Sequence, residues 1–226
     1  MDSQEREYQH GKNFVDAAAA TPTLQHFIWS TLACVDKSVP HFASKGRIDE
    51  YIETKPGLAK ITTYLVVGFY SSNLAEHDPP RLEGGKYVWK QPVKPDGILP
   101  TAGYVQVNCG LLVDAILRHP DLTQGKGVAG YVGNTFGETL ELWGKAVGKE
   151  VEYVYVPFDE FVKQSPGDPR VVLELALGMA YFGNHGLEGF AKPGIEMVTK
   201  EQLGVDGWVD AEEAFRRIDW TAILTQ

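Results

Sequence analysis

Two side chains that could carry protons, His41 and Lys45, stand four residues apart in a segment with a helical pattern. Residues at this spacing share one face of a helix, so we expect the imidazole and the ammonium to point the same way. An imidazole exchanges protons near neutral pH, and an ammonium can lower the pKa of a neighbouring acid. A third candidate, Ser30, lies at the end of the preceding apolar segment, where its hydroxyl could hold a substrate oxygen. The pattern indicates acid–base chemistry on a small molecule, although Lys45 as a solvated helix lysine and Ser30 as an ordinary strand-end hydroxyl remain an open alternative.

Strands and helices alternate around these residues. We expect a helix over residues 9–20, an uncharged strand over residues 26–32, a helix over residues 42–52 and another uncharged strand over residues 61–67. Strand, helix and strand in this order form the crossover of a parallel sheet, which makes the fold class α/β. Ligands of open α/β sheets bind at the carboxyl ends of the strands, so the site is expected near Ser30 and Gly68.

The rest of the chain is predicted from its turn and capping residues. Residues 76–100 are rich in proline and glycine around the aromatic patch Tyr87-Val88-Trp89, and they should form an irregular excursion that holds a short hairpin. A helix over residues 105–117 and a strand over residues 126–132 follow, and Thr135-x-x-Glu138 should open a helix that ends near residue 147. A half-exposed strand over residues 151–156 precedes helices that open at Asp168-Pro169, Thr199 and Asp210.

Charge and composition exclude several classes of function. The chain has 21 Lys and Arg against 30 Asp and Glu, and this net charge of −9 opposes direct binding to nucleic acid or to an anionic membrane. Its apolar runs fall short of the roughly 18 residues of a membrane helix, so we expect a cytoplasmic protein. Cys34 and Cys109 are too few for a disulfide framework and should be buried and inert, and the scattered histidines predict no metal site.

A glycine pattern could suggest a dinucleotide turn, but its context argues against that interpretation. Gly127, Gly130 and Gly133 have the spacing of such a turn, yet the segment before them is polar and the glycines fall inside the predicted strand. The same spacing recurs at Gly183, Gly186 and Gly189 behind an apolar helix. Neither run is expected to hold a cofactor phosphate.

Several segments together resemble a known family. They are Glu7-x-x-x-Gly11-Lys12-Asn13, His26-Phe27-Ile28-Trp29-Ser30-Thr31-Leu32, Val39-Pro40-His41-Phe42-x-Ser44-Lys45 and Thr63-Tyr64-Leu65-x-x-Gly68-Phe69-Tyr70-x-x-Asn73. Their spacing closely resembles the NmrA-like family of atypical short-chain dehydrogenases, which are related to isoflavone reductases.

The resemblance implies a Rossmann-type, NADP-binding fold with a helical substrate lobe. His41 and Lys45 match the Tyr-x-x-x-Lys motif of the dehydrogenases with histidine in place of tyrosine, and Ser30 matches the strand-end serine. The loop beside the nicotinamide is matched by the substrate-binding candidates Gly68, Phe69, Tyr70 and Asn73. A single domain is implied, with residues 1–75 and 101–150 as the Rossmann part and residues 76–100 and 151–226 as the substrate lobe.

Two departures from the family pattern shape the expectations. Asn108 stands where relatives often have an aspartate, and the family's glycine fingerprint and first four strands would lie upstream of Met1. A Rossmann sheet truncated in this way should bind NADP weakly or not at all. It should also leave the strand over residues 26–32 as an open edge, which predicts a homo-oligomer.

Three functions remain open at this point. The first is an enzyme that carries out non-redox proton transfer on a small-molecule substrate, such as isomerisation, dehydration or cyclisation. The second is an NADP-dependent reductase whose amino-terminal half is missing from this chain. The third is a non-catalytic, redox-sensing regulator that binds another protein through its acidic surface.

Overall fold

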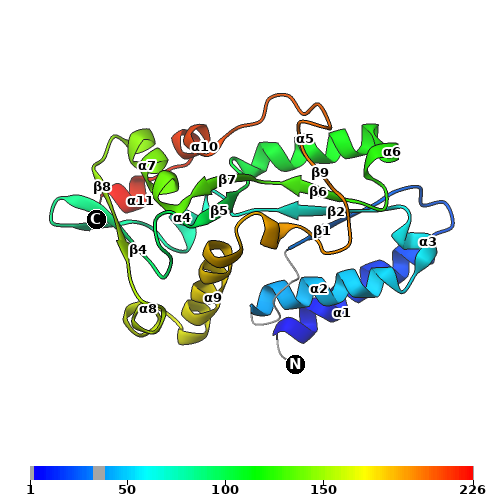
Figure 1. Ribbon diagram of the computed structural model, residues 1–226, viewed down its shortest axis with the longest axis horizontal. Coiled ribbons are helices and arrows are strands. Elements are labelled where there is room, and N and C mark those ends of the chain that lie inside the picture. The colour runs from blue at the N-terminus through cyan, green and yellow to red at the C-terminus, as the bar shows by residue number, and fades with distance from the viewer. Residues whose placement is uncertain (1–2, 33–38, 226) are drawn as a thin grey trace. The chain divides into compact units, whose positions relative to one another are not determined.

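A parallel four-stranded sheet organises the first of two units into which the chain divides. The computed structural model describes residues 3–32 and 39–225 (Figure 1). Unit 1 comprises residues 1–67, 109–130 and 189–207, and unit 2 comprises residues 68–108, 131–188 and 208–226. Residues 189–207, expected in the substrate lobe, therefore pack with unit 1.

The sheet of unit 1 has the order β1–β2–β6–β9, with β1 (Phe27–Thr31), β2 (Thr62–Val67), β6 (Gly127–Gly130) and β9 (Met197–Val198). All of its strand pairs are parallel, which confirms the predicted α/β class. Strands flank β2 on both edges and all its residues are buried, as its β-branched composition predicts. An uncharged, aromatic and β-branched segment is typical of a buried strand, but β1 differs: within the described residues it pairs with β2 alone, and most of its residues are partly exposed.

Helices cover both faces of this sheet. Figure 1 shows α1 (Ser3–Ala19), α2 (Pro40–Glu53) and α3 (Pro56–Ala59) on one face, and α5 (Val105–Arg118) and α6 (Pro120–Thr123) on the other. Pro40 begins α2 at the first helical position. Proline is tolerated there because the backbone N–H of this position has no acceptor within the helix. The core between α1, α2 and the sheet contains Val15, Ile48, Ile52, Leu58 and Tyr64. Helix α1 begins earlier and α2 runs slightly longer than predicted.

Unit 2 holds two small sheets. One has the order β3–β4–β8, with β3 (Arg81–Glu83) antiparallel and β8 (Val151–Tyr155) parallel to β4 (Lys86–Gln91). The other pairs β5 (Ile98–Thr101) with β7 (Val132–Thr135). The predicted hairpin is confirmed as β3–β4, which turns at Gly84 and Gly85, both with positive φ.

Three helices of unit 2, α7, α9 and α10, begin where capping residues predicted. The described helices of this unit are α4 (Asn73–Glu76), α7 (Phe136–Val147), α8 (Phe158–Gln164), α9 (Pro169–His185), α10 (Ala211–Arg217) and α11 (Thr221–Leu224). Thr135 and Glu138 form the capping box of α7, and the carboxylates of Asp168 and Asp210 cap α9 and α10. These local signals are confirmed because each cap needs only residues within the first turn.

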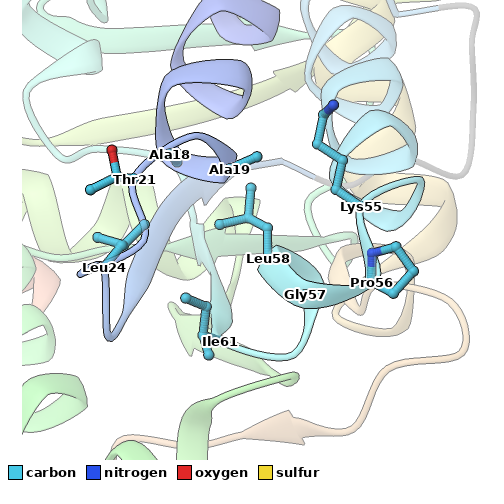
Figure 2. Close-up of a pocket in the computed structure, with 9 residues that line it drawn as sticks. All are labelled: Ala18, Ala19, Thr21, Leu24, Lys55, Pro56, Gly57, Leu58 and Ile61. Atoms are coloured by element: carbon cyan, nitrogen blue, oxygen red, sulfur yellow. The ribbon is translucent and has the colours of Figure 1, made fainter.

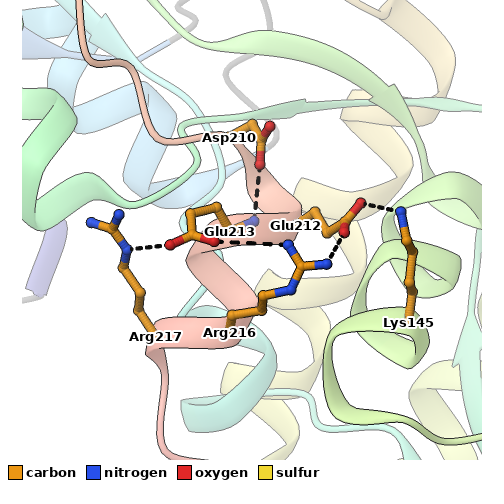
Figure 3. Close-up of polar contacts among 6 residues, drawn as sticks. All are labelled: Lys145, Asp210, Glu212, Glu213, Arg216 and Arg217. Atoms are coloured by element: carbon orange, nitrogen blue, oxygen red, sulfur yellow. Dashed lines mark hydrogen bonds and ion pairs between the residues drawn. The ribbon is translucent and has the colours of Figure 1, made fainter.

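Helix α10 packs against α7 through a buried aromatic group and an exposed ionic network. The ring centres of Trp143, on α7, and Trp220 are 5.6 Å apart. The Trp220 indole N–H donates to the Phe215 carbonyl of α10. On the surface, Lys145 of α7 pairs with Glu212 of α10, and Arg216 and Arg217 pair with acidic residues one turn earlier (Figure 3). Exposed ion pairs contribute little stability, so the aromatic packing holds these helices together.

Two predicted elements differ from the structure. The strand over residues 126–132 is divided at Tyr131, with β6 in unit 1 and β7 in unit 2. The helix predicted to open at Thr199 is absent from the described structure, although Thr199 and Gln202 exchange hydrogen bonds as a capping pair does. Gly204, with φ of +60°, takes the chain out of the turn before a helix can continue.

Candidate functional site

Lys45 of α2 is held between α1 and β1. Its Nζ lies 3.4 Å from Glu7 Oε1 of α1 and 5.1 Å from the centre of the Trp29 ring of β1. The Ser44 hydroxyl donates to the other carboxylate oxygen of Glu7. The Lys45 side chain is 26% exposed, so its ammonium is reachable but already has two partners. This arrangement explains the Glu7, Ser44 and Lys45 spacing as helix packing.

His41 and Ser30 lie in the same unit but have different surroundings. The half-buried His41 ring meets the Phe42 ring edge-on, with 4.5 Å between the ring centres. Trp29 and Thr31 direct their side chains toward α2, where they meet Lys45 and Asp49. Successive side chains alternate along a strand, so the exposed Ser30 side chain points to the opposite face of the sheet. The structure thus brings Lys45 to β1 but places the Ser30 side chain on the other face.

A buried acidic residue, Asp49, lies on α2 four residues beyond Lys45. The Thr31 hydroxyl donates to Asp49 Oδ2 at 2.9 Å, and Lys192 Nζ lies 3.5 Å from the same oxygen. Lys192 also lies 3.0 Å from Glu53 and 4.7 Å from the centre of the Tyr64 ring. Burial raises the pKa of Asp49 to about 6, against the lowering effect of the Lys192 charge and the Thr31 hydrogen bond.

Buried polar atoms without a partner surround this carboxylate. Asp49 Oδ1 and the Tyr64 hydroxyl have no hydrogen-bond partner among the described residues, and the Trp29 indole N–H is near enough to Asp49 to lower its pKa. Burial, together with the charges of Asp49 and Glu53, raises the pKa of Tyr64. Asp49 was not among the predicted site residues, although its spacing puts it on the helix face of His41 and Lys45. Lys192 had no such signal, because its partner lies 143 positions away.

The four predicted substrate-binding residues lie together in unit 2. A Cβ at Gly68 would lie 2.5 Å from the Pro100 carbonyl oxygen and 2.7 Å from Tyr131 Cβ, so only glycine fits there. The Phe69 N–H donates to the Pro100 carbonyl, and the Phe69 carbonyl accepts from Ala102. Tyr70 is 39% exposed, and its carbonyl accepts from the Asn73 N–H at the start of α4. Whether these residues bind a substrate stays a prediction, as does the catalytic role of Ser30, His41 and Lys45.

Asn108, the departure from the family pattern, has a structural role. Its side-chain amide donates to the carbonyls of Ala102 (2.8 Å) and Val209 (2.7 Å), and its Oδ1 accepts from the Val209 N–H (2.9 Å). The side chain is 1% exposed. An aspartate could not donate to these two carbonyls, which accounts for the amide at this position.

The glycine runs do not fit a nicotinamide cofactor. Gly127 and Gly130 lie within β6 and Gly133 lies within β7, as expected. Gly183 lies inside α9, and Gly186 ends that helix. A pyrophosphate turn needs glycines between a parallel strand and the helix that it opens, and neither run has this position. The described residues of these runs therefore supply no phosphate cradle.

A shallow apolar pocket in unit 1 lies away from the predicted chemistry. It has a volume of about 320 Å³ and is lined by Ala18, Ala19, Thr21, Leu24, Lys55, Pro56, Gly57, Leu58 and Ile61 (Figure 2). Leu24 and Ile61 come just before β1 and β2, so the pocket is at the amino ends of these strands. Lys55, its charged residue, already lies 3.2 Å from Asp16. The pocket offers no group free for catalysis.

The structure bears on two further predictions, which concern membrane helices and the two cysteines. No helix within residues 3–32 and 39–225 is long and apolar enough to cross a membrane. Cys34 lies outside the described residues, whereas Cys109 is half-buried and burial raises the pKa of its thiol.

Comparison with known proteins places these features in a family. A sequence model of the NmrA-like family matches residues 2–215. The chain is 27% identical over 201 residues to the nitrogen metabolite repression protein nmrA of Emericella nidulans, covering 81% of this chain and 54% of that protein. It is 26% identical over 171 residues to the nitrogen metabolite repression protein nmr of Neurospora crassa, covering 70% of this chain and 34% of that protein. The chain therefore spans about half or less of the length of these relatives.

Solved structures share the fold. The structure of NmrA, a negative transcriptional regulator, in complex with NAD has a TM-score of 0.71 and 22% identity, covering 96% of this chain and 71% of that one. Leucoanthocyanidin reductase of Vitis vinifera with NADPH has a TM-score of 0.61 and 16% identity, covering 95% of this chain and 72% of that one. These matches confirm the Rossmann-type fold class.

Proposed function

The chain belongs to the NmrA-like family, and we propose that it acts as a non-catalytic regulator that binds another protein. A structurally similar protein, NmrA, is a negative transcriptional regulator that binds NAD or NADP. Both curated relatives carry names of nitrogen metabolite repression proteins, and we extend that role to this chain.

The observation that carries the proposal is the engagement of Lys45. A dehydrogenase-type lysine must offer its ammonium to a cofactor or a substrate. Here Glu7 and Trp29 hold that ammonium, and the Ser30 side chain points to the other face of the sheet. The residues that could do chemistry therefore contribute to packing between α1, α2 and β1.

Complementation tests this role. The chain would be expressed in an Emericella nidulans strain that lacks nmrA, and a nitrogen-repressed transcript would be measured with ammonium present. We expect repression to return with the unmodified chain and with the His41→Ala, Lys45→Gln double variant. Glutamine is chosen because it retains a polar group that can face Glu7. Thermal unfolding of the purified double variant checks that it is folded.

Two results would contradict the proposal. One is a chain that accumulates in the cell but restores no repression. The other is a folded double variant that has lost a repression which the unmodified chain restores, because that result would make the two side chains necessary for function.

The second candidate is an enzyme for non-redox proton transfer, such as isomerisation, dehydration or cyclisation of a small molecule. The partial exposure of Lys45 favours it, because a lysine whose side chain is 26% exposed can move its ammonium from Glu7 to an incoming acidic group. In that case His41 would exchange the proton with the substrate. If the chain converts a small-molecule substrate and the His41→Ala, Lys45→Gln variant does not, this candidate is selected.

A further inference from the structure

Strand β8 leaves one edge of the three-stranded sheet of unit 2 open. Within the described residues β8 pairs only with β4, in parallel. The Tyr87 N–H donates to the Glu150 carbonyl and the Val156 N–H donates to the Gln91 carbonyl, both at 2.9 Å. Alternate residues of a parallel strand bond the same neighbour, so Glu152 and Val154 also face β4.

The other β8 residues direct their backbone groups away from β4. These are Val151, Tyr153 and Tyr155, whose N–H and C=O groups have no hydrogen-bond partner among the described residues. Their side chains share one face, where Val151 packs against Gly144 of α7 and Tyr153 packs against Trp89. The strand is thus anchored by its side chains, and its open edge has the regular spacing that an added strand would need.

Acidic side chains flank this edge. Residues 150–160 contain the four exposed acids Glu150, Glu152, Asp159 and Glu160, against one exposed base, Lys149, just before them. Lys86 reaches Glu152 only at 3.8 Å, with both side chains about half exposed, so it offsets little of that charge. Asp159 and Glu160 lie in the first turn of α8, directly after the strand.

We propose that the open edge of β8 binds an extended, basic segment of a partner protein by strand addition, an inference that rests on the proposed regulatory role. The backbone of Val151, Tyr153 and Tyr155 would bond the added strand, and the flanking carboxylates would select lysine and arginine side chains. A second copy of β8 is a poor occupant, because pairing would set its acidic residues against those of the first copy.

Amide exchange with a defined probe tests the geometry. The probe is a short peptide of alternating lysine and valine, and the control peptide has glutamate in place of lysine. We expect the lysine peptide to slow exchange at the N–H groups of Val151, Tyr153 and Tyr155. Those of Glu152 and Val154 serve as an internal control, because they already bond β4.

Variants separate the charge from the backbone edge. Glu150→Lys should raise the dissociation constant of the lysine peptide by about tenfold, since it reverses a flanking charge. Glu141→Lys makes the same change of net charge on an exposed part of α7 and should leave binding unchanged. Tyr155→Pro removes one outward N–H without breaking the ladder to β4 and should weaken binding more than Tyr155→Ala.

The proposal would be overturned by peptide protection in another segment, by equal effects of Glu150→Lys and Glu141→Lys, or by self-association that protects the same three amides. These results differ from a failure of the regulatory role. A chain that binds the lysine peptide at β8 but restores no repression would support strand addition and refute the regulatory role. A chain that restores repression but does not bind the peptide at β8 would refute strand addition alone.

Discussion

The ammonium of Lys192 lies 3.5 Å from a carboxylate oxygen of Asp49, and the two side chains are 9% and 1% exposed. Asp49 belongs to α2, and Lys192 belongs to the segment that leads into β9, so the pair joins two distant parts of unit 1. Burial of the pair costs desolvation free energy that the attraction between the charges offsets only in part, as the raised pKa of Asp49 indicates.

This relationship predicts a pH-dependent stability difference between the wild type and Asp49→Asn. The pKa of Asp49 rises from 3.8 to about 6 on folding, so the folded state binds the proton more tightly than the unfolded state. The wild type should therefore lose stability from this group as the pH rises from about 4 through about 6. The free energy of unfolding of Asp49→Asn, relative to that of the wild type, should therefore rise by roughly 3 kcal/mol across this pH window.

Chemical unfolding of both proteins at several pH values measures this difference. The exposed Asp206→Asn is the matched control and should show no such trend. A stability difference for Asp49→Asn that does not change between acidic and neutral pH would show that Asp49 titrates as an ordinary carboxyl.

Gly11 predicts a steric limit between α1 and α2. A Cβ at this position would collide with the Ile48 side chain, which is fully buried. Gly11→Ala should destabilise the protein by about 1–3 kcal/mol despite the better helix propensity of alanine. Thermal or chemical unfolding measures the effect.

Two variants show whether the collision is the cause. Gly110 lies in α5, and a Cβ added there would have no neighbouring atom within 4 Å, so Gly110→Ala should be neutral or stabilising. Ile48→Val, added to Gly11→Ala, should restore part of the lost stability because it removes the colliding methyl group. Equal effects of Gly11→Ala and Gly110→Ala would contradict the steric explanation.

Asn108→Asp should destabilise unit 2. The substitution leaves the Ala102 carbonyl without its Asn108 donor, removes one of the two donors to the Val209 carbonyl, which keeps the Tyr104 N–H, and sets a carboxylate against both. We expect a loss of at least about 2 kcal/mol at neutral pH. In the control Asn134→Asp, the new carboxylate can still accept the hydrogen bond from the Thr101 hydroxyl, so the loss should be small. Comparable unfolding midpoints for the two variants would count against this role of Asn108.

NADP should bind this chain weakly or not at all. The two glycine runs lie in strands, in a helix and at a helix end instead of in a phosphate turn, and the net charge of −9 opposes a polyanion. Calorimetric titration of the 226-residue chain measures the affinity directly. A dissociation constant in the micromolar range or tighter would refute the prediction.

Features that depend on neighbouring residues were predictable from the sequence. The caps at Thr135, Asp168 and Asp210 and the uncharged strand β2 all follow from local chemistry. The helix expected at Thr199 failed because Gly204 overrides a correct capping pair. A capping signal therefore predicts a helix only where the residues after it can continue the helix.

The candidate site was less predictable, because its contacts join distant residues. The spacing of His41 and Lys45 placed both on α2, but it carried no information about Glu7 as the partner of Lys45. The direction of Ser30 depends on which β1 side chains meet α2, and that is set by Trp29 and Thr31. Lys192 and β9 reach the sheet through tertiary contacts alone.

The edge of β1 predicts self-association of a kind that β8 disfavours. The Phe27 N–H donates to the Ile61 carbonyl, so Phe27, Trp29 and Thr31 face β2 and the backbone groups of Ile28 and Ser30 point outward. No charged residue lies between Asp16 and Asp36, so two copies of this edge would meet without repulsion. We therefore expect a homodimer or a higher oligomer, which light scattering would detect. Ser30→Pro removes an outward N–H and should yield a monomer, whereas Ser30→Ala should not. A compact wild-type monomer with fast amide exchange at Ile28 and Ser30 would show that the edge stays open in solution.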